Sequence, residues 1–182
     1  MSGALLSISV VKGLDDWLQA QALRAIVYVG EQDYAFAEEF DGGDLCGATH
    51  FLARSGGEPV GACRIRWFAD FAKLERMAVK AAYRSRGVPR ALWLHASNLA
   101  ARKGYEVFLG HIERGLLQYW ERVAGFVPRE GRPTYRLNGR EFFEAIAPIP
   151  RHPDAIRLNA PARLVLASDA DLTAGAPARK AS

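Results

Sequence analysis

The spacing of hydrophobic positions along the chain predicts an alternation of strands and helices. Short stretches rich in β-branched and aromatic residues are typical of strands, and longer stretches with helical spacing are typical of helices. Strands are predicted over 5–11, 72–80 and 105–112, hairpins over 49–68 and 134–148, and helices over 14–32, 88–104 and 113–125. This order, β-α-loop-β-β-β-α-β-α-β-β, indicates a mixed α/β domain with one central sheet.

The same pattern predicts which helical side chains face the core. Residues three or four positions apart lie on one side of a helix. The predicted core-facing positions are Leu18, Ala22, Ile26 and Val29 in the first helix and Leu92, Ala96 and Leu99 in the second.

Length and composition fit a single globular domain. The chain has 182 residues, of which 49% are hydrophobic and 24% charged, an ordinary balance for a packed domain. The predicted elements occupy residues 1–147. Residues 148–182, rich in proline, alanine and small polar residues, are predicted to form an extended tail whose last ten or so residues are disordered.

Other sequence features narrow the location and the chemistry. No apolar stretch approaches the roughly 18 residues of a membrane helix, and no basic segment precedes the first apolar run, so neither a membrane span nor a signal peptide is predicted. Cys46 and Cys63 form no CxxC and no Cys/His pattern. No disulfide framework and no metal site are therefore expected, and a cytoplasmic location is favoured.

The charges are unevenly distributed, although the net charge is only +4. Between Arg24 and Arg54 there is no Lys or Arg. This segment carries six acids, Glu31, Asp33, Glu38, Glu39, Asp41 and Asp44, and the arginines gather later, at Arg64, Arg66, Arg76, Arg84, Arg86 and Arg90. The arginine-rich part favours an anionic ligand, and the acidic segment is expected to meet something else.

A short loop at 84–90 joins a predicted strand to a predicted helix. Backbone N–H groups and the positive end of a helix dipole converge at such a junction and suit an anion. Gly87 permits close backbone approach, whereas Pro89 has no N–H to donate. The patterns GxGxxG and GxxxxGK[ST] are absent, which disfavours a dinucleotide-binding dehydrogenase and a P-loop nucleotidase. A solvated basic helix start is the alternative.

The stretch LERMAVKAAYRSRGVPRALWLHASNLAARKGY (74–105) resembles the core of the GNAT acyltransferase superfamily, and YWERVAGF (119–126) resembles its second conserved segment. The resemblance implies a GNAT fold, α/β (α+β), with a single mixed central β-sheet flanked by helices. It implies that backbone N–H groups of the loop bind the pyrophosphate of acetyl-CoA and that strand 77–79 pairs with pantetheine. The implied cofactor-binding residues are Met77, Ala78, Val79, Arg84, Ser85, Arg86, Gly87, Val88, Pro89 and Arg90.

Three positions depart from the family pattern. Pro89 replaces a Gly or Ala and removes one N–H donor. Trp120 stands at the position of the family's tyrosine, a frequent general acid for the departing thiolate, and Glu113 at that of a frequent asparagine. The adjacent Tyr119 is therefore the candidate acid, with water or Tyr135 as alternatives.

Glu75 is the candidate general base. Strand periodicity places it on the same side as Met77 and Val79, where the thioester is expected. The alternative is a structural ion pair with Arg64, Arg66 or Lys73. His111, at the end of a predicted strand, is interpreted as structural, with a proton relay as the alternative.

The acidic stretch RAIVYVGEQDYAFAEEFDGGD (24–44) resembles a branch of small GNAT proteins and, more weakly, the acyl-homoserine lactone synthases. The resemblance implies a substrate pocket for a cationic amine. A solvated acidic loop is the alternative. The implied substrate-binding residues are Glu31, Asp41, Asp44 and Arg64.

The sequence is thus interpreted as an N-acetyltransferase that moves acetyl from acetyl-CoA to an amine in a ternary complex. The alternatives are a non-catalytic acyl-CoA-binding protein and an acyltransferase resembling the acyl-homoserine lactone synthases. The expected partner is a small-molecule amine, with no nucleic acid and no membrane, and a homodimer is left open. Fold alone does not identify the acceptor.

Overall fold

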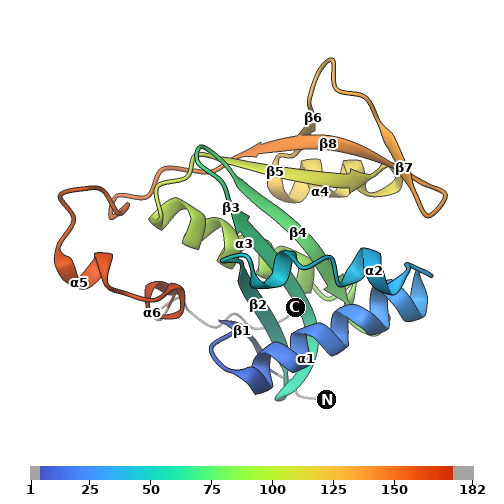
Figure 1. Ribbon diagram of the computed structural model, residues 1–182, viewed down its shortest axis with the longest axis horizontal. Coiled ribbons are helices and arrows are strands. Elements are labelled where there is room, and N and C mark those ends of the chain that lie inside the picture. Colours follow the sequence, from blue (N-terminus) through green and yellow to red (C-terminus); the bar gives the residue numbers. More distant parts are fainter. Residues whose placement is uncertain (1–4, 174–182) are drawn as a thin grey trace.

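A computed structural model describes residues 5–173, in which one mixed sheet of eight strands runs through the molecule (Figure 1). The strand order is β1-β2-β3-β4-β5-β8-β6, with β7 also paired to β8. Among the strands of residues 5–173, only β4 and β5 pair in parallel, and all other neighbours are antiparallel. The strands are β1 Leu6–Val10, β2 Thr49–Ser55, β3 Glu58–Trp67, β4 Ala72–Val79, β5 Val107–Glu113, β6 Val127–Pro128, β7 Tyr135–Leu137 and β8 Arg140–Pro148.

The predicted element order and mixed sheet are confirmed, and both predicted hairpins form, β2–β3 and β7–β8. The two-residue strand β6 was not predicted. The helices are α1 Leu14–Ala25, α2 Phe36–Glu39, α3 Val88–Arg102, α4 Leu117–Ala124, α5 Ala162–Val165 and α6 Asp169–Thr173. A π-helical turn, Ile26–Glu31, extends α1.

Helices α1 and α3 cover opposite faces of β2–β4 (Figure 1), and each buries one apolar stripe. The predicted stripe of α3 is confirmed, because Leu92, Ala96 and Leu99 are fully buried. The predicted stripe of α1 is wrong. Leu18 and Ile26 are each about half exposed, and the buried positions are Ala20, Gln21, Leu23, Arg24 and Val27. The error arises because two polar residues, Gln21 and Arg24, occupy the buried stripe and mask its hydrophobic period.

A β-bulge interrupts β4. Ala78 pairs with Ala62 and Glu75 with Arg64, so β4 carries one more residue than β3 over this stretch. Arg76 absorbs the extra residue with a φ of 53°. One inserted residue reverses the alternation of side chains beyond it.

The bulge corrects the predicted face of Glu75. Met77 and Val79 pack with the core on the α3 side, as does Leu74. Glu75 neighbours Leu74 within the regular part of the strand and therefore points to the other side. The prediction that Glu75, Met77 and Val79 share one side is wrong for this reason.

Strands β4 and β5 separate soon after they meet. Their parallel pairing is confined to Ala72 with Phe108 and Lys73 with Leu109. Beyond these pairs the two strands diverge, as Figure 1 shows, and leave a V-shaped split in the sheet. Gly110 lies on the β5 side, where a Cβ would come within 3.0 Å of the Phe126 ring. The split positions the candidate site.

The segment after β8 packs back onto the domain. Helix α6 contacts β1 and α3, and Ala170 and Leu172 are buried in the main core. The expected extended conformation is therefore incorrect for the part that holds α5 and α6. The predicted disorder of the last ten or so residues falls on residues 174–182, outside those described. Over residues 5–173, no helix combines the length and apolar character of a membrane span.

Candidate active site

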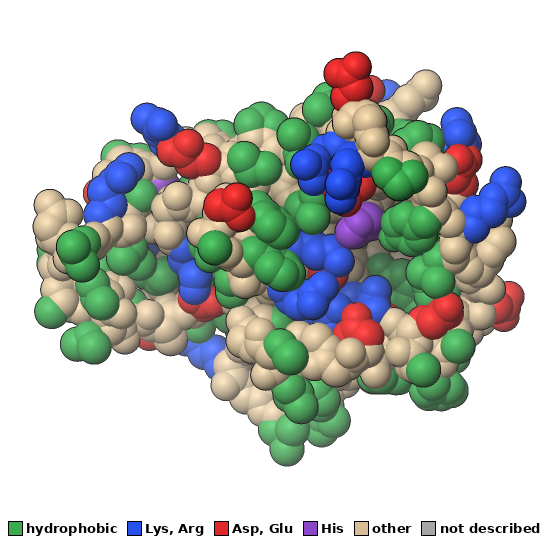
Figure 2. Space-filling view, turned by 45° about the horizontal axis from the view of Figure 1, so that its top comes forward, with side chains coloured by type: hydrophobic (Ala, Val, Ile, Leu, Met, Phe, Trp, Pro, Cys, Tyr) green, Lys and Arg blue, Asp and Glu red, His purple; other side chains and the backbone are tan. Residues whose placement is uncertain are grey.

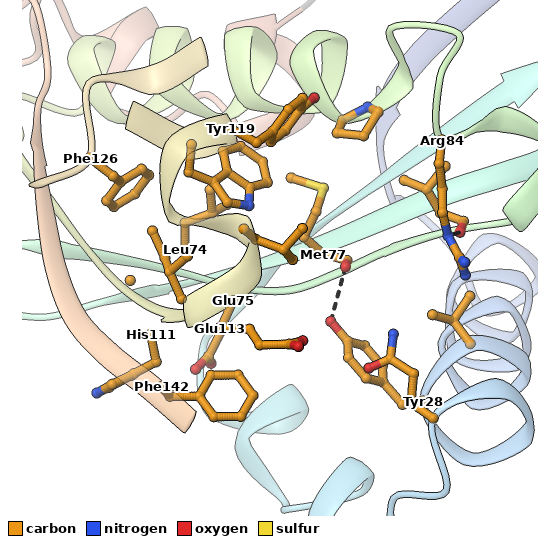
Figure 3. Close-up of a pocket in the computed structure, with 18 of the residues that line it drawn as sticks. Tyr28, Leu74, Glu75, Met77, Arg84, His111, Glu113, Tyr119, Phe126 and Phe142 are labelled. Carbon is orange, nitrogen blue, oxygen red and sulfur yellow. Dashed lines mark hydrogen bonds between the residues drawn. The ribbon is translucent and has the colours of Figure 1, made fainter. Parts of the chain in front are cut away.

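A cavity of about 340 Å³ occupies the split between β4 and β5 (Figure 3). Its walls come from β4, β5, β8, the π-helical turn after α1, the loop before α3 and the first turn of α3, and α4. Among the lining residues are Tyr28, Tyr34, Leu74, Glu75, Met77, Val79, Arg84, Pro89, His111, Glu113, Tyr119, Trp120, Phe126 and Phe142. Figure 3 shows Glu75, Glu113, His111 and Phe142 together at one end, and Tyr119 at the opposite end.

Tyr28 spans the cavity from the π-helical turn to the bulged strand. Its hydroxyl donates a hydrogen bond of 3.0 Å to the carbonyl oxygen of Met77 (Figure 3). Burial raises the pKa of this hydroxyl above its ordinary value, so it stays protonated at neutral pH. Because its proton is committed to Met77, the oxygen is left as an acceptor toward the cavity. Tyr28 was not predicted as a site residue, because a tyrosine inside a helical pattern is typical of core packing.

The loop before α3 presents backbone donors at one point. Gly87 has a φ of 73°, which favours glycine, and it immediately precedes α3. Within the described chain, the N–H groups of Ser85, Gly87 and Val88 have no intramolecular acceptor. Pro89 lies in the first turn of α3, is buried and lines the cavity, and contributes no donor. The predicted helix start is thus present, with one donor missing.

Arg84 folds back over the end of β4. Its Nε donates a 3.0 Å hydrogen bond to the carbonyl of Val79, and its Nη2 contacts Glu31 in an ion pair. Glu31, a predicted substrate-binding residue, therefore lies at the loop and not beside the other acids. Arg84 thus engages the carbonyl oxygen of Val79, a hydrogen-bond acceptor that an extended ligand lying along β4 would otherwise use.

Glu75 is held by three cations. Its carboxylate contacts Arg64 at 2.8 Å, Arg66 at 2.6 Å and Lys73 at 2.9 Å. Burial acts to raise the pKa of Glu75, but hydrogen bonding and charge from Lys73, together with Arg64 and Arg66, outweigh it and lower the pKa below its ordinary value. A carboxylate stabilised in this way is a weak base. The contacts of Glu75 therefore agree with the alternative interpretation, in which it forms structural ion pairs.

His111 faces the split from β5. Parallel register sets His111 level with Glu75 across the opening, since Lys73 pairs with Leu109. Burial first, and the charge of Lys73 second, lower the pKa of His111 below 6.5, so the ring is neutral at pH 7. Its Nε2 lies 4.0 Å from Oε2 of Glu144. A neutral imidazole at the cavity wall can accept a proton.

Neither aromatic residue of α4 supplies an obvious acid. Trp120 is buried and lines the cavity, and its indole can donate a hydrogen bond without releasing the proton. Tyr119 also lines the cavity, yet its hydroxyl points toward α3 and away from Met77 (Figure 3). Burial raises the pKa of Tyr119. Tyr135, the other candidate, lies edge-on to His111 with the ring centroids 5.5 Å apart.

The acidic segment pairs with arginines from the sheet and α1. Arg64, fully buried, donates to Asp41 at 2.9 Å and to Asp44 at 2.8 Å. Arg24, also fully buried, donates to Asp44 at 2.6 Å and to Glu39 at 2.6 Å. Asp41, Asp44 and Arg64 do not line the cavity. The structure brings these three predicted residues together in a partly buried ion-pair network, and the carboxylates of Asp41 and Asp44 lie outside the cavity lining.

Comparisons with known proteins agree with this geometry. Residues 13–126 match the acetyltransferase (GNAT) family. The uncharacterized protein YyaT of Bacillus subtilis (strain 168) is 28% identical over 131 residues, which cover 71% of this chain and 82% of YyaT. An acyl-CoA N-acyltransferase from Pseudomonas aeruginosa has 22% identity and a TM-score of 0.70, covering 78% of this chain and 99% of that one. The CoA-dependent acyl-homoserine lactone synthase BjaI has 17% identity and a TM-score of 0.65, and the match covers 91% of this chain and 100% of BjaI. At such identities the two structural likenesses show a shared fold.

Proposed function

The chain belongs to the GNAT acetyltransferase family, and from that premise we propose that it moves an acetyl group from acetyl-CoA to the amine of a small molecule, by direct attack in a ternary complex. The observation that carries this proposal is the place of the cavity. It fills the split between β4 and β5, and Arg84 and Pro89 of the donor-rich loop form part of its wall. A volume of about 340 Å³ suits a small acceptor beside a thioester.

In the proposed complex, acetyl-CoA lies along β4 and ends at α3. The pyrophosphate accepts hydrogen bonds from the N–H groups of Ser85, Gly87 and Val88, at the positive end of a 15-residue helix. Arg86 and Arg90, both exposed, add positive charge. Pantetheine pairs with residues 77–79, which requires Arg84 to leave the carbonyl of Val79.

The chemistry then takes place at the bulge. The acceptor nitrogen attacks the thioester carbonyl carbon, and the backbone N–H of Met77 stabilises the developing oxyanion. Neither Arg76 nor Met77 has a register partner on β3, which supports this assignment. The hydroxyl oxygen of Tyr28 accepts a hydrogen bond from the amine and orients it.

We assign the general base to His111, since it is neutral at pH 7 and faces the split. It takes the proton that the ammonium must lose before or during attack. Collapse of the tetrahedral intermediate breaks the carbon–sulfur bond and releases the CoA thiolate. Because a thiol has a pKa of about 8.5, water can protonate the thiolate near neutral pH. The indole N–H of Trp120 supports the sulfur with a hydrogen bond.

Titration calorimetry with acetyl-CoA and with CoA tests the cofactor site. We expect micromolar binding by the wild type and at least tenfold weaker binding by Gly87→Glu, which adds a negative charge beside the pyrophosphate. Gly47→Glu is the matched control, because Gly47 also has a positive φ, 66°, with open space around it. The control should bind like the wild type. Absence of binding by the wild type would overturn the proposal.

Pro89→Ala restores the missing donor. A hydrogen bond to a charged group contributes about 1.5–3 kcal/mol, and 1.4 kcal/mol corresponds to a factor of ten in affinity. We expect the variant to bind CoA about tenfold more tightly, measured by the same calorimetry. Pantetheine serves as the control ligand. Because it lacks the pyrophosphate, its affinity should be the same for the wild type and for Pro89→Ala. An unchanged affinity for CoA would show that this position does not face the pyrophosphate.

Trp120 and Pro89 favour a second candidate function, a CoA-binding protein without turnover. Both replace family residues that serve catalysis or cofactor binding. CoA binding together with no acetyl transfer to any amine would support this candidate, whereas single-turnover transfer would exclude it.

A further inference from the structure

The open face of the split is lined by charged side chains. Helix α1 covers β2–β4 on this side, whereas α3 and α4 lie on the other side of the sheet. Side chains from β4, β5 and β8 on this side therefore face the opening, where Glu75, His111 and Glu113 line the cavity. Figure 2 shows a hollow in this face with Lys and Arg side chains gathered beside it.

Three carboxylates lie at this opening, and each has a cationic partner. Glu144 contacts Arg129 and Arg132, and Glu113 contacts Arg140 at 3.0 Å. Glu75 contacts Arg66 and Lys73, besides the buried Arg64 that also serves Asp41 and Asp44. The charge of Arg64 is assigned to its other partners, Asp41 and Asp44. The three carboxylates at the opening are then contacted by five other cations: Arg66, Lys73, Arg129, Arg132 and Arg140.

These groups therefore carry an excess of two positive charges. The excess arises because Glu75 and Glu144 each contact two of the five cations. We call Arg66, Lys73, Arg129 and Arg132 the basic rim. Arg66 and Lys73 reach Glu75 from β3 and β4, and Arg129 and Arg132 reach Glu144 from the loop after β6. His111 lies between the two pairs, because β5 lies between β4 and β8 in the sheet and His111 pairs with Glu144.

We propose that the acceptor amine carries an anionic group, a carboxylate or a phosphate, that binds at the basic rim beside His111. Guanidinium forks pair with either group in a two-point geometry. The stacked rings of Tyr135 and Phe142, 5.5 Å apart, form an apolar wall next to this position. This inference rests on the proposed acyl transfer, and it replaces the expectation of an acidic pocket for a cationic amine.

The site's charge balance argues against a polyamine acceptor. A second ammonium group would lie among cations whose carboxylate partners are already engaged. An anion instead meets two Arg or Lys groups on each side of His111 without breaking the existing pairs. The acceptor amine can thus be held by its anionic group while its nitrogen reaches the thioester.

The test uses product analogues, so it does not depend on knowing the acceptor. The probes are N-acetylglycine, N-acetylglycinamide and inorganic phosphate, each titrated with and without saturating CoA. Binding is followed by the NMR signals of the His111 ring, assigned by their loss in His111→Gln. We expect at least tenfold tighter binding of N-acetylglycine than of the neutral amide. Whether phosphate or N-acetylglycine binds more tightly identifies the anionic group.

Arg66→Gln/Arg132→Gln removes one cation from each side of the basic rim. Each affected carboxylate keeps another cationic partner, Glu75 with Lys73 and Arg64 and Glu144 with Arg129, so the fold is expected to persist. The double variant should lose the preference for the anion. Arg151→Gln is the charge control, since Arg151 pairs with Glu106 and its side chain is 80% exposed.

The two proposals fail in different ways. Equal binding of N-acetylglycine and its amide, together with normal CoA binding, would overturn the anionic acceptor and leave acyl transfer intact. Absence of CoA binding would overturn acyl transfer, and with it the assignment of the rim to an acceptor. Anion binding that survives in the double variant would also overturn the role of the basic rim.

Discussion

Replacing His111 with glutamine is expected to lower kcat for acetyl transfer by about 10²–10⁴-fold, the usual contribution of a general base. Glutamine keeps the size and polarity of the side chain but cannot take a proton near neutral pH. CoA binding should stay within twofold of the wild type, since the base acts on the acceptor. The measurements are steady-state acetyl transfer and calorimetry on the same preparations.

The pH dependence of kcat distinguishes His111 from other bases. Burial and Lys73 lower the pKa of His111 below 6.5, so the ring accepts protons at neutral pH and is blocked by protonation at lower pH. The wild-type rate should therefore be level near pH 7 and fall tenfold per pH unit below the His111 pKa. His111→Gln should lack this limb. The charged and titratable groups facing the ring are Lys73 and Glu75 of β4, Arg66 of β3, Glu144 of β8 and Tyr135 of β7.

The Glu75→Gln variant tests whether Glu75, the general base predicted from the sequence, takes the proton in place of His111. If Glu75 is an ion-pair residue, this variant keeps the acid limb of the pH profile, although its unfolding free energy falls. The opposite pattern, with the limb lost in Glu75→Gln and retained in His111→Gln, would reassign the base to Glu75. Because the two side chains lie level across the split, the profiles and not the rates alone decide the assignment.

Local signals in the sequence were sufficient for the order of the elements and for the start of α3. Regular periodicity identified α3 and every strand of the described sheet except β6, and a glycine before a helix start identified the junction at Gly87, where φ is 73°. The face of Glu75 was missed because one bulged residue at Arg76 reverses the strand alternation, and a bulge leaves no reliable trace in a hydrophobic pattern. The position of Tyr28 depends on the same bulge, since it donates to Met77.

The acidic segment shows a different limit of sequence reasoning. Its six acidic residues are equally consistent with a pocket for a cation and with a solvated loop, because the sequence does not show which groups these residues contact. In the structure, Arg24 from α1 and Arg64 from β3 reach this segment from 15 to 23 residues away in sequence. Such partners are set by tertiary contacts. Arg24, together with Gln21, also masks the buried stripe of α1, so Arg24 contributes to both errors.

Removing Arg64 is expected to destabilise the protein by about 3 kcal/mol, the lower end of the cost of removing one partner from a buried ion pair, because each of its carboxylate partners keeps another cation. Arg64 is fully buried and contacts Asp41, Asp44 and Glu75 at 2.8–2.9 Å. Arg64→Met keeps the apolar stem and removes the guanidinium. The free energy of unfolding in urea at pH 7 measures the loss. Arg151→Met is the control, because exposed pairs contribute about 0–1 kcal/mol.

The same variant has a pH signature with a defined sign. Hydrogen bonding from Arg64 lowers the pKa of Asp41 below its ordinary value, and the pKa of Asp44 and Glu75 is lowered as well. A carboxylate with a lowered folded pKa contributes stability above its unfolded pKa, about 4, and loses it as the pH falls further. The stability difference between wild type and Arg64→Met should thus be largest at pH 7 and shrink at pH 3. A difference that is constant over this range would mean that Arg64 stabilises the fold through packing and not through its charge.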